Sequence, residues 1–491
     1  MNTDRDMTEK VSIIKFDTSF GSDAGGDFTL PDYMPEIKRL LYVSASALPE
    51  GKFLGGGVLE LDGVMSYNAV YVGDDDSLNA APLNIEYSAD TALPAAVEGT
   101  DSVFVDTAIE STTCRATGPR SLNIKSRLKF RVSADDTYSP ENDGGDVERL
   151  TEDVPCVVRR RGSVTESVVG TLPDSGGAVP LMCDGTLAVT SASVADGGVR
   201  ASGKICVRCV TRRDGDYAAV HGEIPFETTV PIESDIAATG ARACGRIASL
   251  NVSQGADGEF SVTAEYDLDA EEYAVRDAEI CTDAYAKNYE CECAYRDCEI
   301  PVMIAFGAEN VEVTGETELK NPDGARVLAT SPAQIQASVT ASDGKVTVSG
   351  SVKLRVLINA GGEIYSQEIE MPLKREIADA PEGATSADLQ SFLVCSENTS
   401  SAKISGLSLE GHCSVALSYS VSLRRRETIV DKVTPGEAIP EDAPVIRVYY
   451  PERDESAWSI AKKYRADRAR FEKNNSFDGG VARKGKPVII I

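Results

Sequence analysis

The sequence predicts a mainly β protein, built from three tandem β-sandwich or barrel-like repeats and a small C-terminal βααβ domain. In residues 346–358 polarity alternates at every second position around a central glycine, as in a strand with one buried face. The same pattern recurs in residues 59–72 and 199–212. From residue 445 onwards the period changes to that of short helices between two strands. A repeated sheet unit and a distinct C-terminal domain follow from these two observations.

The three copies of this strand align on one glycine each. The aligned residues, Gly63, Gly203 and Gly350, are 140 and 147 residues apart, which is the size of one domain. An alternating run precedes each copy and ends in an acidic, glycine-rich turn, so each copy predicts a β-hairpin and the three units are expected to be homologous. The runs are residues 42–52, 189–198 and 335–345.

The composition suits several small β-domains. A chain of 491 residues exceeds the size at which a single hydrophobic core keeps growing. Hydrophobic residues make up 42% of the chain and aromatic residues only 6%, so β-branched and small side chains must fill the cores. This favours modest sheets over a large enzyme core built around a deep pocket.

Charge is distributed unevenly along the chain. The net charge is −29, which repels phosphate backbones and anionic lipids and argues against general nucleic-acid or membrane binding. Residues 446–491 contain 11 Lys and Arg against 6 Asp and Glu, so this tail carries +5 and the remainder −34. We expect the basic tail to be attracted to the acidic body at low salt, unless a partner occupies it.

No segment of the sequence predicts export or membrane insertion. The first residues are interrupted by charge every few positions, and no window reaches the ~18 apolar residues of a membrane span. The 12 cysteines are therefore expected to be reduced thiols in a cytosol, mostly buried as small hydrophobic side chains.

The N-terminal part is expected to contain a flexible leader and a short helix. Residues 1–25 lack a clean period, although residues 11–16 could add a strand. Asp32 and Pro35 are suited to start a helix whose apolar face would include Ile37, Leu40 and Leu41. Similar short helices are expected where repeats two and three open, near residues 146 and 283.

The phrase TLPDYMPEIKRLL at residues 29–41 resembles the start of the SPOCS domain, which is found in spore-coat morphogenesis proteins of endospore-forming bacteria. The resemblance extends over residues 27–433 as three copies, of which only the first keeps the Pro-Asp-x-x-Pro-Glu-Ile phrase. The expected organisation is a leader (1–25), three SPOCS-like repeats (26–137, 138–275 and 276–433), a linker (434–444) and a C-terminal domain (445–491).

The C-terminal domain is expected to run strand, helix, helix, strand. Residues 445–450 form the first strand, and residues 457–464 place apolar side chains at i, i+3, i+4 and i+7 of a helix. A second helix begins at Asp467, whose carboxylate favours the positive end of a helix, and residues 487–491 close the domain as a strand.

This pattern resembles a LysM domain, which in most contexts binds N-acetylglucosamine chains. The resemblance rests on WSIAKKY at residues 458–464, on an asparagine ending the second helix and on Gly485-Lys486. The Gly-Asp-Thr-Leu phrase usual in the sugar-lining loop is Asp454-Glu455-Ser456-Ala457 here, which makes close approach of a sugar to the backbone harder. The leucine usual before the last strand is Pro487.

Together, SPOCS repeats and a LysM domain resemble coat morphogenetic proteins. The resemblance implies a non-enzymatic adaptor in the mother-cell cytoplasm, at the forespore surface, which binds the stage IV sporulation protein A ATPase. In that family LysM serves as a protein-docking surface. Peptidoglycan binding through LysM is the alternative, and a metal-dependent enzyme is a third hypothesis.

Partner or glycan contacts are expected on the LysM-like domain. Lys462, Lys463 and Arg465 are the plausible partner contacts, although an exposed helix face that aids solubility has the same pattern. Trp458, the only tryptophan, is expected to be mainly structural. The full set of candidate residues is Asp454, Glu455, Ser456, Trp458, Lys462, Lys463, Arg465, Asn474 and Asn475.

No catalytic, metal or cofactor site is predicted. Cys206 and Cys209 form a CxxC motif within a strand, where residues three apart point to opposite faces. Cysteines 291, 293 and 298 lack a fourth zinc ligand nearby, and the two histidines, His221 and His412, lie in different repeats. The arginine runs 159–161 and 424–426 are expected to be solvated strand ends.

Overall fold

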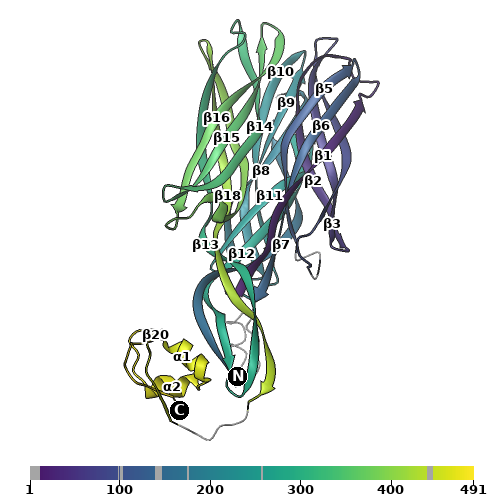
Figure 1. Cartoon of the computed structure of the whole chain (residues 1–491). Helices are drawn as coiled ribbons and strands as arrows, with labels where there is room; N and C mark the ends of the chain where they lie inside the picture. The colour runs from purple at the N-terminus through teal and green to yellow at the C-terminus, as the bar shows by residue number, and fades with distance from the viewer. Residues whose placement is uncertain are drawn as a thin grey trace.

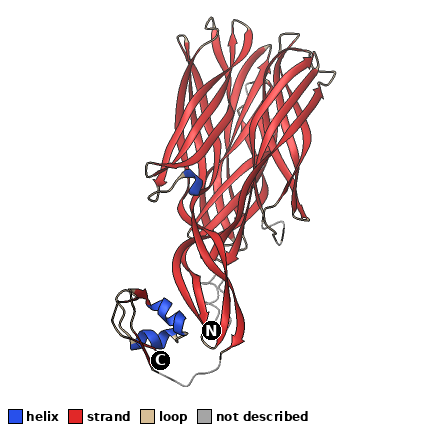
Figure 2. Cartoon of the chain, in the orientation of Figure 1, coloured by secondary structure: helices blue, strands red, loops and turns tan. Residues whose placement is uncertain are grey.

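The computed structural model describes residues 11–97, 99, 103–138, 146–173, 176–255, 258–439 and 446–490. Long antiparallel strands account for most of them, and α-helices occur only near the C-terminus of this part of the chain (Figure 2). A short 3-10 turn, η2 (Ser386–Asp388), precedes β17. The prediction of a mainly β protein with several antiparallel sheets is confirmed.

Among the described residues, strands occur in three successive groups of six with the same pairing. The second to fourth strands of each group form a hairpin-connected sheet, and the sixth strand lies between the first and the fifth in a facing sheet. The first group is β1 (Val11–Thr29), β2 (Ile37–Gly55), β3 (Val58–Gly73), β4 (Leu78–Ala92), β5 (Phe104–Gly118) and β6 (Ser121–Tyr138). The second is β7 (Val147–Leu172), β8 (Val179–Ala195), β9 (Gly198–Arg213), β10 (Asp216–Pro231), β11 (Gly240–Gln254) and β12 (Phe260–Ala286). The third is β13 (Tyr289–Glu318), β14 (Ala325–Ser342), β15 (Lys345–Ala360), β16 (Glu363–Asp379), β17 (Leu389–Ser405) and β18 (Ser408–Ala438).

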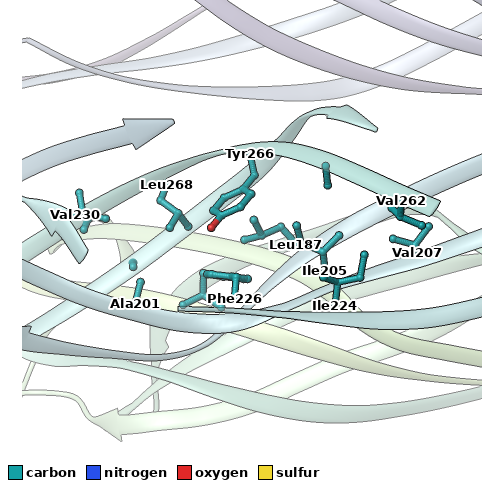
Figure 3. Packing of buried hydrophobic residues seen from close by; sticks show 14 of the residues in the cluster. Leu187, Ala201, Ile205, Val207, Ile224, Phe226, Val230, Val262, Tyr266 and Leu268 are labelled. Atoms are coloured by element: carbon teal, nitrogen blue, oxygen red, sulfur yellow. The ribbon is translucent and has the colours of Figure 1, made fainter. Parts of the chain in front are cut away.

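Each group encloses its own hydrophobic core between its two sheets. In the second group the core is made mostly of Val, Ile, Leu and Ala, and it includes Phe226 and Tyr266, whose tilted rings have centroids 5.1 Å apart (Figure 3). Branched and small side chains therefore fill the space, as the low aromatic content predicts.

The three aligned glycines lie in the middle strand of each three-stranded sheet. A Cβ atom at Gly63, Gly203 or Gly350 would come within 2.4, 2.1 and 1.9 Å, respectively, of a backbone oxygen on the preceding strand. The neighbouring strand therefore passes closer to these positions than any side chain permits. The same requirement in all three sheets explains why the sequence pattern centres on glycine.

Three strand pairs continue beyond the sandwiches and converge into a narrower stalk, which leads to the C-terminal helices (Figure 1). The pairs are the lower ends of β1 with β6, β7 with β12, and β13 with β18. Their apolar side chains form one shared core that includes Val11, Val154, Ile280, Ile300 and Ile429. The three groups are thus joined at the stalk by side chains from all of them.

The prediction of a short helix after Asp32 is wrong. Ile37 begins β2, which pairs with β3 along its whole length. The register shifts between Ile37 and Arg39 and again between Leu40 and Tyr42, so two bulges break the strict alternation. These bulges produce the i, i+3, i+4 spacing of apolar residues that mimics a helix. The helices expected near residues 146 and 283 are also wrong, because β7 begins at Val147 and β12 continues to Ala286.

Several expected boundaries fall inside strands. Residues 11–25, assigned to a flexible leader, belong to β1, which pairs with β6, whereas residues 1–10 lie outside the described residues. The boundary at residue 275 lies within β12, and β18 extends into the expected linker to Ala438. The rest of that linker, residues 440–444, is also outside the described part.

The three predicted hairpins are present, with one difference in the first. β2 passes through the expected Glu50-Gly51 turn with a bulge between Pro49 and Gly51, and the chain reverses at Gly56-Gly57. In the third group the reversal lies at Asp343-Gly344, where φ is 53° and 71°, as its acidic-glycine sequence predicts.

Candidate functional site

Residues 446–490 form a small module with the predicted strand, helix, helix, strand order. Its elements are β19 (Arg447–Tyr449), β20 (Glu455–Ser456), α1 (Ala457–Tyr464), α2 (Arg468–Asn474), β21 (Val481–Ala482) and β22 (Val488–Ile490). The side chains of Ser456 and Asp467 cap the helices by accepting hydrogen bonds of 3.0 Å from the backbone N–H groups of Ser459 and Arg470. β20 and β21 add a second, two-stranded pair that the sequence pattern did not reveal.

The module's core includes a residue from the body. Ile460, Phe471 and Val488 are almost completely buried, and Tyr285 of β12 packs among them. The Tyr285 hydroxyl donates a hydrogen bond of 2.6 Å to the backbone oxygen of Ala466, and burial raises its pKa above the usual value. The module is therefore seated on the stalk rather than held only by its linker.

We call the receiving surface the stalk base, which comprises residues 146–149 and 283–290. Trp458 lies against it, with its ring centroid 5.0 Å from that of Tyr285. The Trp458 Nε1–H donates a hydrogen bond of 2.8 Å to Asp283 Oδ2. Trp458 is therefore structural, as expected, but it joins the module to the body instead of lying only within the module.

Opposite charges surround this contact. Lys462 Nζ lies 2.5 Å from Asp283 Oδ1, and Arg465 Nη2 lies 3.5 Å from Glu290 Oε1. In the reverse sense, Lys287 of the base lies 3.3 Å from the module's Asp467. Burial alone would raise the pKa of Asp283, but the hydrogen bonds from Lys462 and Trp458 hold it below its usual value. The attraction between tail and body that the sequence predicts is thus present as specific pairs.

Other candidate residues stabilise the module itself. Asp454 accepts hydrogen bonds from Arg483 Nη1, at 2.9 Å, and from the backbone N–H of Lys484, at 2.8 Å. Glu455 accepts one of 2.9 Å from the Tyr449 hydroxyl. The ammonium of Lys463 lies 4.8 Å from the Tyr449 ring centroid, a cation–π distance. In the loop that resembles a sugar-binding loop, the carboxylates of Asp454 and Glu455 therefore accept hydrogen bonds from adjacent parts of the module.

The two asparagines have different roles. Asn475 Nδ2 donates hydrogen bonds to the backbone oxygens of Phe471, at 2.8 Å, and Ile489, at 2.7 Å. Its Oδ1 accepts a 2.7 Å bond from the Ile489 N–H, so one side chain fixes β22 against α2. Asn474 is exposed at the end of α2.

Sequence reasoning missed an arginine cluster where the three groups meet. The guanidinium carbons of Arg131, Arg161 and Arg242 lie 4.4, 4.8 and 5.2 Å from the ring centroid of Phe392. Glu271 accepts hydrogen bonds of 2.7 Å from both Arg161 and Arg242. Burial alone would raise the pKa of Glu271, but the arginines hold it well below its usual range.

The expectation that residues 159–161 are solvated is therefore wrong for two of them. Arg159 is buried and donates hydrogen bonds to Gln390, at 2.9 Å, and Ser422, at 2.6 Å, whereas Arg160 points outward to Asp235. The period-two alternation of β7 places the first and third arginines on its inner face. In the second run the expectation is wrong for Arg424, whose Nη2 lies 2.7 Å from Asp17 Oδ2, whereas the side chain of Arg426 is exposed.

A cavity of about 580 Å³ adjoins this cluster. Its wall includes Arg131, Arg161, Arg242 and Arg246, together with aromatic side chains. Each of these arginines already has a carboxylate partner: Asp17 for Arg131, Glu271 for the next two and Asp267 for Arg246. The arginines of the wall are thus partly compensated by carboxylates of their own groups, and their contacts with Phe392 join the first and second groups to the third.

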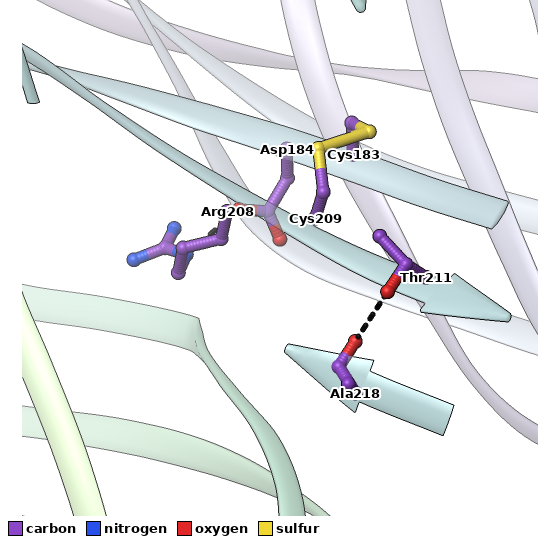
Figure 4. Close-up of a disulfide and its surroundings, with 6 residues drawn as sticks. All are labelled: Cys183, Asp184, Arg208, Cys209, Thr211 and Ala218. Atoms are coloured by element: carbon purple, nitrogen blue, oxygen red, sulfur yellow. Dashed lines mark hydrogen bonds and ion pairs between the residues drawn. A yellow bond between two sulfur atoms is a disulfide. The ribbon is translucent and has the colours of Figure 1, made fainter. Parts of the chain in front are cut away.

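The expectation that all cysteines are reduced is contradicted by one pair. Cys183 and Cys209 form a disulfide (Figure 4), because they are directly opposite each other on β8 and β9. Cys206 points to the other face, as predicted, and its Sγ donates to the backbone oxygen of Asn398. Burial raises the pKa of Cys206 to about 11, which disfavours a thiolate at neutral pH.

Within the described ranges no group of three or more His, Cys, Asp or Glu side chains is arranged to hold a metal ion. His412 lies 3.0 Å from Glu312 across the β13–β18 pair, and His221 lies on β10. None of the helices in the described part has the length and apolar character needed to cross a bilayer. No protein-family model, no curated protein and no solved structure matches the chain.

Proposed function

We propose that the chain is a non-enzymatic adaptor of spore-coat assembly, similar to the SipL class of coat morphogenetic proteins. On this proposal the three six-strand groups are SPOCS repeats and the module is a LysM domain. The protein acts in the mother-cell cytoplasm at the forespore surface, where it binds a coat morphogenetic ATPase of the stage IV sporulation protein A type.

Two features support a repeated, protein-binding architecture. The same strand order and the same glycine-centred middle strand recur in all three groups, which supports a common origin of the repeats. The acidic body and the basic module also offer surfaces of opposite sign to partners.

One observation carries the docking role of the module. An apolar strip crosses its two-stranded sheet on the face opposite its core: Ile446, Val448, Tyr450 and Ile489 are 68, 53, 59 and 37% exposed. Val448 and Ile489 are directly paired in the sheet. Clustered apolar side chains on a protein surface mark interaction sites, and a protein partner covers such a strip better than a hydrophilic glycan does.

The test is capture of the purified ATPase by the full chain carrying Val448→Asp or Ile489→Asp. We expect at least about a tenfold loss of capture, because a central interface residue contributes roughly 2 kcal/mol or more. Leu407→Asp is the matched control, since Leu407 is 66% exposed in the turn between β17 and β18, away from the module. Full capture by both module variants would contradict the proposal.

Peptidoglycan binding is the second candidate, and the βααβ order of the module favours it. In the loop that would line the sugar site, Asp454 accepts hydrogen bonds from the Arg483 side chain and from the Lys484 backbone N–H, and these bonds count against glycan binding. Sedimentation of the full chain with purified cell wall separates the two. Binding well above that of an acidic control protein of similar size would favour the glycan function.

A further inference from the structure

The contact between module and stalk base is a matched pair of surfaces carried by one chain. The module contributes Trp458, Lys462 and Arg465, and the base contributes Asp283 and Glu290. The described part of the body ends at residue 439 and the module begins at residue 446, so the linker between them is residues 440–445. The same two surfaces are therefore present on every copy of the protein.

We propose that the stalk base is a docking site for the module of a second copy as well as for its own, so that two chains can exchange modules. Exchange replaces each contact by an identical one in trans, which is why it costs little and closes symmetrically as a dimer. The second copy is the natural occupant, because only the module has the tryptophan and the cations that fit this base. This inference is independent of the coat function.

Mass action decides which form is populated. A short linker gives the tethered module an effective concentration on the order of 1 mM, so the closed monomer prevails by roughly a thousandfold at micromolar protein. Local concentrations near that value, as in an assembled layer on a surface, would favour exchange. Disabling only the contact within each chain should therefore reveal the exchanged form at low concentration.

Charge reversal on separate chains achieves this. One full-length variant carries Asp283→Lys and the other carries Lys462→Glu, so each loses the ion pair of its own closed form. In a 1:1 mixture, the unchanged module of the Asp283→Lys chain can dock on the unchanged base of the Lys462→Glu chain. At the other contact of the dimer, the two substituted residues again form a pair of opposite charges. Light scattering is expected to show monomers separately and a twofold mass in the mixture at about 10 µM, a hundredfold below the tethered concentration.

Trp458 reports docking directly, because it is the only tryptophan in the chain. Its emission maximum should shift to longer wavelength in each variant alone and return to the wild-type wavelength in the mixture. The control is a chain with both substitutions, which should stay monomeric with wild-type emission. Because Asp283 also accepts a hydrogen bond from Tyr295, Glu290→Arg with Arg465→Glu forms a second pair of chains for the same experiment.

The outcomes are decisive in either direction. Recovery of emission together with a doubled mass establishes exchange. A mixture that remains monomeric up to about 1 mM, the effective concentration of the tethered module, overturns it. Unchanged emission in both single variants overturns it as well, because the charge pairs would then not hold the module.

Discussion

Glu271 is the counter-charge shared by three arginines at the place where the three groups meet, and replacing it with glutamine tests what this carboxylate contributes to stability. The carboxylate is 2% exposed, accepts hydrogen bonds of 2.7 Å from Arg161 and Arg242, and lies 3.8 Å from Arg159. Glu271→Gln keeps the shape and one acceptor oxygen but leaves three guanidiniums without their shared counter-charge. Breaking a buried pair by removing one partner costs about 3–5 kcal/mol, and the retained acceptor favours the lower end of that range.

The assay is thermal unfolding followed by circular dichroism, because the only tryptophan lies in the distant module. A loss of about 3 kcal/mol corresponds to a decrease of roughly 6–12 °C in Tm for a cooperative unit of 150–250 residues. Glu265→Gln is the matched control, since Glu265 lies six residues earlier on the same strand and is exposed, and it should change stability by less than about 0.5 kcal/mol.

The effect of Glu271 should also depend on pH with a defined sign. Its pKa in the folded protein is well below that of an unfolded glutamate, so its stabilisation is complete above an unfolded pKa of about 4.3 and declines as pH falls below it. The difference in Tm between wild type and Glu271→Gln should therefore shrink below about pH 4.5. Equal Tm values for Glu271→Gln and Glu265→Gln at pH 7 would refute this account of the cluster.

Three further outcomes are expected. Gly350→Ala should lower stability by more than about 2 kcal/mol in thermal unfolding, because the new Cβ would overlap a backbone oxygen, whereas Gly51→Ala meets nothing within 4 Å. Cys183→Ser should cost about 2–4 kcal/mol in urea unfolding under non-reducing conditions, and added reductant should lower the wild type to the same level. Asn475→Ala should destabilise the module by about 1–3 kcal/mol, read from Trp458 emission, while Asn474→Ala should have little effect.

Each of these expectations has a contrary result. Equal stability of the Gly350→Ala and Gly51→Ala chains would show that the strands can separate to admit a side chain. A wild-type chain unaffected by reductant would mean that the disulfide adds no stability. Identical emission curves for the two asparagine variants would remove the role assigned to Asn475.

The sequence by itself determined the glycine-centred strand of each group, the hairpin that contains it and the helices of the module. These features follow from local rules: alternation along one strand, a glycine where a neighbour must pass closely, and a change of period at residue 445. Where bulges interrupted the alternation, as at Ile37–Leu41, the same rules predicted a helix that is absent.

Only the tertiary structure decided which faces meet. Alternation predicts that Arg159 and Arg161 share a face, but not that the third group covers that face with Gln390, Ser422 and Phe392. It likewise predicts neither the pairing of Cys183 with Cys209 nor the docking of Trp458 on Asp283. These contacts join residues 26 to 263 positions apart, and such pairings depend on strand register and sheet packing, which no local pattern encodes.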